Sequence, residues 1–437
     1  MLGTLILPGR DPLAIFSRFA RDYGDITFFR MNGERVFFVN HPDYIRQVLV
    51  TEHAKFAKSR ALERARKLLG DGLLTSDGAD HQRRRRLVQP AFHRTQIAGY
   101  AETMVQHAQR IDRWWQDGQS VDVSSDMMRL TLAIVARTLF DADIESRADS
   151  VGEALTAVLE SFWLTLLPFS ELVEALPLRA LKRSAGARAR LDDLIYGMIA
   201  ERRGRGGSRR DVLSMMIGSQ DEGGASGLSD REVRDEALTL LLAGHETTAN
   251  ALMWTWYLLS QAPEVRSRLH EEVDRVLAGR AASVADVESL PCVLGVVTES
   301  MRLFPPVWTI GRRAKADTEL GGYSLPAGSM VFMSQWTMHR DARFYREPDR
   351  FLPGRWTAEL RASLPKHAYF PFGGGPRTCI GESFAWMELV LIVATIAQSW
   401  DLELVPGHPI VTQPLLTLRS RHGMQMTARR RVAAPGA

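Results

Sequence analysis

A long and almost uninterrupted apolar stretch in the middle of the chain restricts the possible folds more than any other feature. Residues 229–261 have helical spacing, begin with the letters SDRE and end before Pro263. SDRE is a capping box, in which a serine and a glutamate satisfy free amides of the first helical turn. About 30 residues correspond to roughly 45 Å of helix. Because the segment is apolar on nearly every side, we expect it to cross the interior, surrounded by other elements.

The centre of this helix contains a polar cluster. Residues 244–248 read GHETT, where a buried helix would be expected to be apolar. Glycine and hydroxyl side chains weaken the hydrogen-bond ladder of a helix and can kink it. Because burial of a polar group costs free energy unless the group is paired, we expect this cluster to meet something polar in the interior.

The rest of the chain predicts a mainly α fold with a minor β region. We find no repeat and no linker, so we expect one domain over residues 1–437. Alternating apolar residues and Pro-Gly turns indicate strands, whereas longer periodic stretches indicate helices. The β-rich parts are expected near residues 25–50, 305–350 and 400–430, and the helical parts near residues 80–303 and 380–399.

Composition narrows the class of protein. A charged content of 24% and a formal net charge of +4 over 437 residues are ordinary for a soluble enzyme and give no sign of nucleic-acid binding. Two cysteines, Cys292 and Cys379, exclude a disulfide scaffold. The apolar start of the chain, about five residues before a Pro-Gly break, is too short to span a bilayer. We expect a cytoplasmic, soluble monomer, unless an anchor precedes this sequence.

One of these cysteines lies in an unusual loop. Residues 372–381 read FGGGPRTCIG and precede an apolar stretch with helical spacing. A metal-bound or reactive thiol needs positively polarised surroundings that favour the thiolate. Glycine amides and the start of the following helix supply such surroundings. The loop taken alone leaves open whether Cys379 is a ligand or an inert buried thiol, whereas Cys292, in an apolar helix start, is expected to pack in the core.

Further motifs occur in an order that is informative. Residues 81–85 read HQRRR, residues 299–302 read ESMR, and EPDRF is followed by PGRW at residues 353–356. With the cysteine loop and the AGHETT cluster, the chain resembles the cytochrome P-450 family, the haem-thiolate monooxygenases, over essentially its full length. The resemblance implies the cytochrome P-450 fold, with haem b between the long central helix and the helix that follows the cysteine loop.

The resemblance assigns a role to each motif. Cys379 would be the axial ligand of the iron, and a thiolate ligand favours cleavage of dioxygen. Phe372 would shield the sulfur from water. The charged residues expected to bind the haem propionates are Arg377, His81, Arg85 and Arg312, with Arg312 preferred over its neighbour Arg313. Further cofactor-binding positions are expected at Gly373, Gly381 and Ala243.

The polar cluster of the central helix would lie over the distal side of the haem. Thr247 would hydrogen-bond the bound dioxygen, Glu246 would relay protons through water, and Gly244 would give room for dioxygen. His245 is expected to be structural. Glu299, Arg302 and Arg355 resemble a buried structural triad that holds the cysteine loop in place.

Substrate contacts are expected to be apolar. By resemblance, a loop at residues 62–74 and residues 162–169 would form the roof of the pocket. The pocket residues themselves are expected to be Val307, Trp308, Ile310, Leu415 and Leu416. Ordinary core packing is the alternative for each of these residues.

We therefore expect a monooxygenase that inserts one atom of dioxygen into an apolar substrate such as a fatty acid, terpenoid, steroid or macrocycle. Electrons would come from NAD(P)H through a reductase and a ferredoxin or flavodoxin-type donor. Arg83, Arg84 and Arg86 either attract that acidic donor or form a plain solvated face. The alternative functions are a peroxide-driven peroxygenase or decarboxylase and, more remotely, a haem-based sensor.

Overall fold

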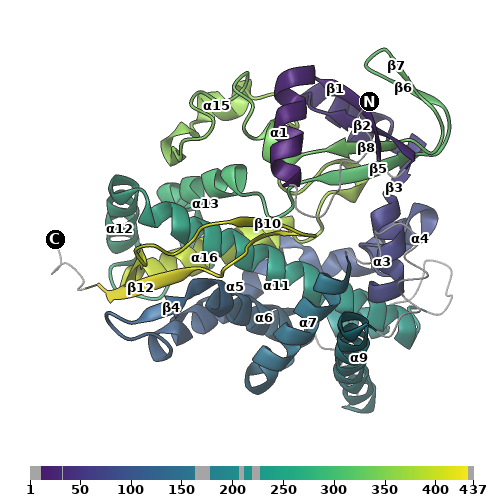
Figure 1. Ribbon diagram of the computed structural model, residues 1–437. Helices are drawn as coiled ribbons and strands as arrows, with labels where there is room; N and C mark the ends of the chain where they lie inside the picture. Colours follow the sequence, from purple (N-terminus) through teal and green to yellow (C-terminus); the bar gives the residue numbers. More distant parts are fainter. Residues whose placement is uncertain (1–10, 32, 163–177, 206–210, 219–226, 432–437) are drawn as a thin grey trace.

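The structure is a computed structural model that describes residues 11–31, 33–162, 178–205, 211–218 and 227–431. Helices dominate the chain, and short strands flank them (Figure 1). The α-helices are α1 (Pro12–Tyr23), α2 (Pro42–Arg46), α3 (Arg60–Leu69), α4 (Gly78–Val88), α5 (Arg94–Gln109), α6 (Val123–Phe140), α7 (Ala148–Phe162), α9 (Arg179–Arg205), α10 (Val212–Gly218), α11 (Asp230–Ser260), α12 (Pro263–Leu277), α13 (Pro291–Leu303), α14 (Gln335–Met338), α15 (Ala358–Ser363) and α16 (Glu382–Ser399).

Some strands pair with neighbours in sequence, whereas the pairs β4–β12, β2–β8 and β3–β5 join segments from opposite ends of the chain. They are β1 (Ile26–Met31), β2 (Glu34–Val39), β3 (Phe56–Lys58), β4 (Ser120–Asp122), β5 (Ile310–Ala314), β6 (Thr318–Leu320), β7 (Tyr323–Leu325), β8 (Met330–Met333), β9 (Trp400–Leu404), β10 (Thr412–Pro414), β11 (Leu418–Ser420) and β12 (Gln425–Arg430). The largest sheet has the order β1-β2-β8-β5-β3, in which β2 and β8 are parallel. A second sheet joins β4 to β12 and β9. The mainly α fold with a minor β region is thus confirmed.

Helix α11 is the long helix that the sequence predicts. Its capping box is present, because the Ser229 side chain accepts from the Glu232 amide and the Glu232 carboxylate accepts from the Ser229 amide. It passes through the middle of the molecule and packs against α6, α9, α13 and α16 (Figure 1). The helix stays continuous through its polar cluster. The side chains of His245 and Thr247 bond to carbonyl oxygens four residues earlier without interrupting it.

Two segments near the N-terminus differ from their expected conformation. Residues 42–51, predicted within a β-rich part, form α2 and a π-helical turn, because Pro42 fits the first turn of a helix. Much of the expected loop at residues 62–74 is helix α3, whose N-cap is Ser59. The Ser59 hydroxyl accepts from the Leu62 amide and so starts the helix there. The predicted roof residues 163–169 lie outside the described residues.

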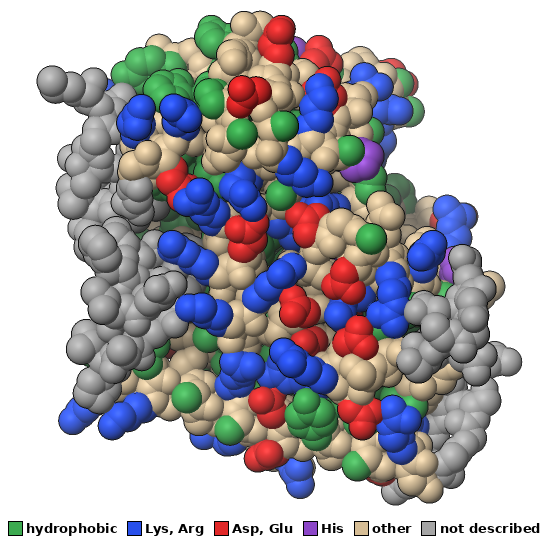
Figure 2. Space-filling view, turned by 90° about the vertical axis from the view of Figure 1, so that its right-hand side faces the viewer, with side chains coloured by type: hydrophobic (Ala, Val, Ile, Leu, Met, Phe, Trp, Pro, Cys, Tyr) green, Lys and Arg blue, Asp and Glu red, His purple; other side chains and the backbone are tan. Residues whose placement is uncertain are grey.

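The surface carries both signs of charge. Figure 2 shows the side of the molecule on which α3 and α4 lie in Figure 1, where Lys and Arg side chains alternate with Asp and Glu. Among the described helices, none combines the length and apolar character needed to cross a bilayer.

Candidate active site

The cysteine loop is held in one conformation by its own backbone. The Cys379 amide donates to the Phe372 carbonyl oxygen at 3.0 Å, which closes the loop just before α16. Gly375 has a φ of +69°, and a Cβ atom there would overlap the Leu49 carbonyl oxygen. A glycine is therefore required at this position on two grounds, its backbone conformation and the close approach of another chain segment. The Phe372 ring packs against Trp386, with ring centroids 5.6 Å apart.

The Cys379 thiol lies deep in the molecule and is still reachable. Burial raises its pKa, whereas the side chain retains accessible surface. Both statements hold when a side chain lines an enclosed space instead of the outer surface. The Gly381 amide points at the sulfur and favours the thiolate. A bound metal cation would complete that stabilisation, because a coordinating thiol is deprotonated.

Four basic side chains gather beside this loop. Burial and the neighbouring charges of Lys58, Arg85 and Arg312 lower the pKa of His81 to about 4. Arg312, on β5, is buried, and burial lowers its pKa to about 10. Arg85, from α4, donates to the Thr378 carbonyl oxygen at 2.7 Å. Positive groups held together out of water need anionic partners.

Arg377 of the cysteine loop lies next to these four residues, and we call all five the cationic cluster. Arg377 differs from the other four because its side chain already pairs with an acid. Its guanidinium bonds to the Asp77 carboxylate, the N-cap of α4, while its Nη1 atom is buried without a partner. The unpartnered nitrogen and the surplus positive charge fit the two propionates of a haem. Cys379, His81, Arg85, Arg312 and Arg377 are therefore suited to hold that cofactor.

The central helix presents an accessible strip in the middle of its buried length. Ala243 is exposed and Thr247 is half-buried, although the next turn of α11 on either side is buried. The Thr247 hydroxyl donates to the Ala243 carbonyl oxygen at 2.6 Å. His245 lies on another side of the helix, fully buried, with Nδ1 2.8 Å from the Leu241 carbonyl oxygen. Thr247 is thus the hydroxyl that a ligand against this strip could reach.

Glu246, one residue before Thr247, has its own hydrogen-bond partners, and its expected role in relaying protons stays a prediction. Its carboxylate accepts from Arg419 Nε at 2.7 Å and from the Thr417 hydroxyl, both on the C-terminal hairpin. It does not contact Thr247, because consecutive helical residues point about 100° apart. The expected acid–alcohol pair therefore consists of neighbours in sequence whose side chains have different partners.

Gly244 lies at the contact between α11 and α6. A Cβ atom at this position would lie 2.9 Å from Val135 Cγ2 of α6. The missing side chain therefore permits close packing of α6 on α11. The expected role, room for dioxygen, stays a prediction.

The triad of Glu299, Arg302 and Arg355 is brought together. Glu299 and Arg302, both on α13, have side chains with 0% exposure and form an ion pair at 2.9 Å. Arg355 Nε donates to Glu299 at 2.9 Å. Arg302 in turn donates to carbonyl oxygens of the segment that leads to the cysteine loop, at residues 339, 348 and 350.

These features, a reachable thiol in a glycine loop, a cationic cluster and an accessible strip on a long central helix, agree with a direct comparison of sequences. The family model described as cytochrome P450 matches residues 1–426. The chain belongs to the cytochrome P450 family. It is therefore an oxidoreductase of the monooxygenase class, and its cofactor is haem b.

Several cytochrome P450 relatives are similar over nearly their whole length. The chain is 40% identical to cyclooctatin synthase of Streptomyces melanosporofaciens, over 96% of this chain and 91% of the relative. It is 37% identical to cyclooctat-9-en-7-ol 5-monooxygenase of the same organism, over 93% and 88%. Pentalenene oxygenase of Streptomyces avermitilis is 33% identical over 98% and 94%. The crystal structure of the cytochrome P450DA heme domain superposes with a TM-score of 0.87 at 30% identity, covering 97% of this chain and 94% of that one.

Apolar residues of this cytochrome P450 come together on two adjoining segments. Val307 and Ile310 lie on one segment and Leu415 and Leu416 on the other, and all four are half-buried. The segments are joined because the Leu418 amide donates to the Pro306 carbonyl oxygen at 2.9 Å. We call these four residues the apolar wall.

Trp308 does not belong to the apolar wall. Its ring packs with Leu13 and Leu418 in a separate core cluster, and its indole nitrogen donates to the Leu415 carbonyl oxygen at 2.8 Å. Trp308 therefore positions the hairpin instead of lining a pocket.

The arginine run of α4 does not form a basic patch. Arg84 is buried and pairs with Glu236 of α11 and with Asp80, while Arg83 pairs with Glu232. Only Arg86 of these three is exposed. Four consecutive helical residues point in different directions. The three arginines therefore do not act together, either as a surface for an acidic donor or as a plain solvated face.

Two buried titratable side chains, Lys58 and Glu388, were not predicted from the sequence. Lys58 donates to the carbonyl oxygens of Leu73 and Leu74, and burial together with Arg377 lowers its pKa to about 6. Glu388 of α16 is fully buried near Thr248 of α11, and burial raises its pKa well above the ordinary value. The three-residue strand that contains Lys58 gives no sequence signal for such a role.

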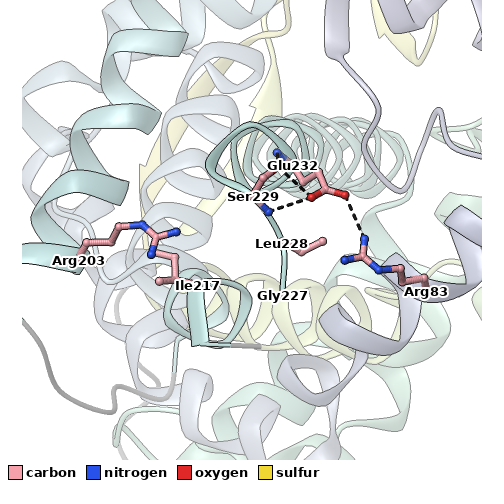
Figure 3. A pocket seen from close by; sticks show the side chains of 7 residues that line it. All are labelled: Arg83, Arg203, Ile217, Gly227, Leu228, Ser229 and Glu232. Atoms are coloured by element: carbon pink, nitrogen blue, oxygen red, sulfur yellow. Dashed lines mark hydrogen bonds and ion pairs between the residues drawn. The ribbon is translucent and has the colours of Figure 1, made fainter. Parts of the chain in front are cut away.

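A surface pocket of about 490 Å³ lies near the start of α11 (Figure 3). It is lined by Arg83, Arg203, Ile217, Gly227, Leu228, Ser229 and Glu232. None of these residues belongs to the cysteine loop or to the apolar wall. Arg83 and Glu232 point toward each other and are paired (Figure 3), and Arg203 pairs with Asp230. This pocket is therefore not the substrate site.

We expect Gly244→Ala to destabilise the folded protein by about 1–3 kcal/mol, the usual cost of an extra methyl group in a packed interface. Thermal and urea unfolding of the haem-loaded protein measure this cost. Gly99→Ala is the matched control: Gly99 lies in α5 with nothing within 4 Å of its Cβ position, so stability should rise slightly. Adding Val135→Ala to Gly244→Ala should restore part of the loss. A Gly244→Ala protein as stable as the wild type would contradict the packing role.

Proposed function

We propose that this cytochrome P450 oxygenates a cyclic terpenoid. One atom of dioxygen enters the substrate and the other leaves as water, which consumes two protons and two electrons. The electrons come from NAD(P)H through a reductase and a ferredoxin or flavodoxin-type donor. Residues 1–437 act as one catalytic domain in this proposal.

The apolar wall is the observation that carries the substrate class. Val307, Ile310, Leu415 and Leu416 are aliphatic and partly accessible, so they offer dispersion contacts and no charge or hydrogen bond. A compact ring hydrocarbon or its alcohol fits such a surface. The names of two relatives support this choice, because cyclooctat-9-en-7-ol and pentalenene are a cyclic alkenol and a cyclic alkene.

Other residues would bind the cofactor and supply protons. Cys379 would bind the iron, and the cationic cluster around His81 and Arg312 would hold the propionates. When bound, the haem supplies the iron that activates dioxygen. The Thr247 hydroxyl would hold a proton next to the exposed Ala243, on the accessible strip of α11. Glu246, buried one residue earlier, would resupply that proton.

The electron donor would dock beside the cysteine loop, where α4 contacts it through Arg85. Of the α4 arginines discussed above, Arg86 remains exposed to meet an acidic partner. Its charge would steer association and would matter less at high salt.

The experiment screens cyclic terpene hydrocarbons and alcohols, fatty acids, steroids and macrocycles for the spectral shift that follows displacement of water from the haem iron. The strongest ligands are then incubated either with NAD(P)H, ferredoxin and reductase or with hydrogen peroxide. We expect terpenoids to give the shift and oxygenated product to form with the reductase system. Thr247→Ala should release more peroxide while haem binding survives. Equal or faster product formation with peroxide alone would favour a peroxygenase, and a shift only with fatty acids would overturn the substrate class.

A further inference from the structure

The C-terminal hairpin of β10 and β11 is fastened to one face of the central helix. Glu246, Asn250 and Trp254 lie four residues apart on α11 and therefore share a face. Trp254 Nε1 donates to the Leu418 carbonyl oxygen at 2.9 Å, and Asn250 Nδ2 donates to the Thr417 hydroxyl at 3.3 Å. Successive helical turns thus bind neighbouring residues of one hairpin.

The third member of this face is the acid that the proposed function uses. Glu246 Oε1 accepts from both Thr417 Oγ1 and Arg419 Nε. Glu246 has 3% side-chain exposure, whereas Arg419 has 14%. The guanidinium therefore offsets a buried negative charge and itself retains some accessible surface. Removal of one partner of such a pair leaves the other charge uncompensated.

The same hairpin contributes to the apolar wall. Leu415 and Leu416 lie between β10 and β11, directly before Thr417. Trp308 and Pro306 bond to Leu415 and Leu418, so the hairpin is held from two sides. The two leucines precede Thr417 and Arg419 by only one to four residues. A displacement of the leucines therefore moves the groups that hold Glu246.

We propose that Thr417 and Arg419 are positioning residues for proton supply, and that the hairpin links contact with substrate to the position of the Glu246 carboxylate. Arg419 stays protonated and fixes the carboxylate, while Glu246 takes protons from water beside it and passes them toward Thr247, where they leave in the water that dioxygen yields. This inference rests on the proposed function, because it needs a turnover that consumes protons.

The test uses the haem-loaded full chain with the terpenoid that gives the largest spectral shift, NAD(P)H, ferredoxin and reductase. Product per NAD(P)H, peroxide released and the solvent deuterium isotope effect are measured for Arg419→Gln, Arg419→Lys and Thr417→Val. We expect Arg419→Gln and Thr417→Val to lower product per NAD(P)H roughly tenfold, less than the roughly 10²–10⁴-fold that a proton donor itself contributes, because these residues only position the donor. Released peroxide should account for the difference, and the isotope effect should rise.

Two comparisons separate positioning from mere structural support. Arg429→Gln, an equal loss of charge at an exposed residue of β12, should leave all values unchanged. Arg419→Lys, which keeps the charge, should recover most of the coupling. Substrate titration should stay close to wild type in both weakened variants, whereas the melting temperature should fall in Arg419→Gln, which leaves the buried Glu246 carboxylate without its counter-charge, and less in Thr417→Val. Unchanged coupling and isotope effect in both Arg419→Gln and Thr417→Val, with a wild type that forms product, would overturn the inference. A wild type that forms no product would instead overturn the proposed function.

Discussion

Cys379→Ser is expected to abolish the absorption band that the reduced carbon monoxide complex of a thiolate-ligated haem gives, and with it product formation. A serine hydroxyl remains protonated and donates far less electron density than a thiolate. The variant therefore lacks the ligand that promotes cleavage of the O–O bond. The loop itself should keep its shape, because the Cys379 amide and the Phe372 carbonyl form their bond without the side chain. Reduced carbon monoxide spectra and product assays measure both effects.

Cys292→Ser is the control for this substitution. Cys292 lies at the start of α13, where its amide donates to Glu272 and its thiol is half-buried away from the loop. The band and the activity should remain. Persistence of the thiolate band in Cys379→Ser would mean that another residue binds the iron, and the assignment of the ligand would be wrong.

Glu299→Gln is expected to cost about 3–5 kcal/mol of folding free energy and to weaken haem retention. Its carboxylate accepts five hydrogen bonds, from Arg302 Nε and Nη2, Arg355 Nε, Trp356 Nε1 and the Leu352 amide, all at 2.9–3.1 Å. A glutamine removes the negative charge and turns an amide group toward these donors. The Arg302 guanidinium, with 0% exposure, is then left as an unbalanced buried charge.

Urea unfolding monitored by fluorescence and by haem absorbance measures this loss. Glu288→Gln, at an exposed position before α13, is the matched control and should stay within about 0.5 kcal/mol of wild type. If Glu299→Gln unfolds at the wild-type urea concentration, the triad does not carry the stability that its geometry suggests.

Local signals explain which parts of the fold and site were predictable. The start of α11 was predictable because the capping box uses residues three positions apart, and its end because Pro263 follows at once. The cysteine loop was predictable from its glycines, since Gly375 allows an approach that no other residue permits. The Glu299–Arg302 pair likewise lies within one helical turn.

Other parts depend on contacts that no local pattern contains. Glu246 binds Arg419 across 173 positions of sequence, so the spacing of residues 244–248 could not reveal which way the acid points. The orientation of Trp308 depends on Leu13 of α1 at the opposite end of the chain. The HQRRR motif places an arginine on each side of α4, but the buried side is decided by acids of α11.

The parallel pairing of β2 with β8 has a consequence for biosynthesis. Val36 pairs with Phe29 of β1 on one side and with Met330 of β8 on the other, so one edge of β2 has no partner until more than three quarters of the chain has been synthesised. Until then Phe37 and Phe38, both buried in the finished sheet, remain uncovered next to unpaired amides, which is a template for association with other chains. Such distant pairing slows folding, and production of this protein should therefore benefit from low temperature and chaperones.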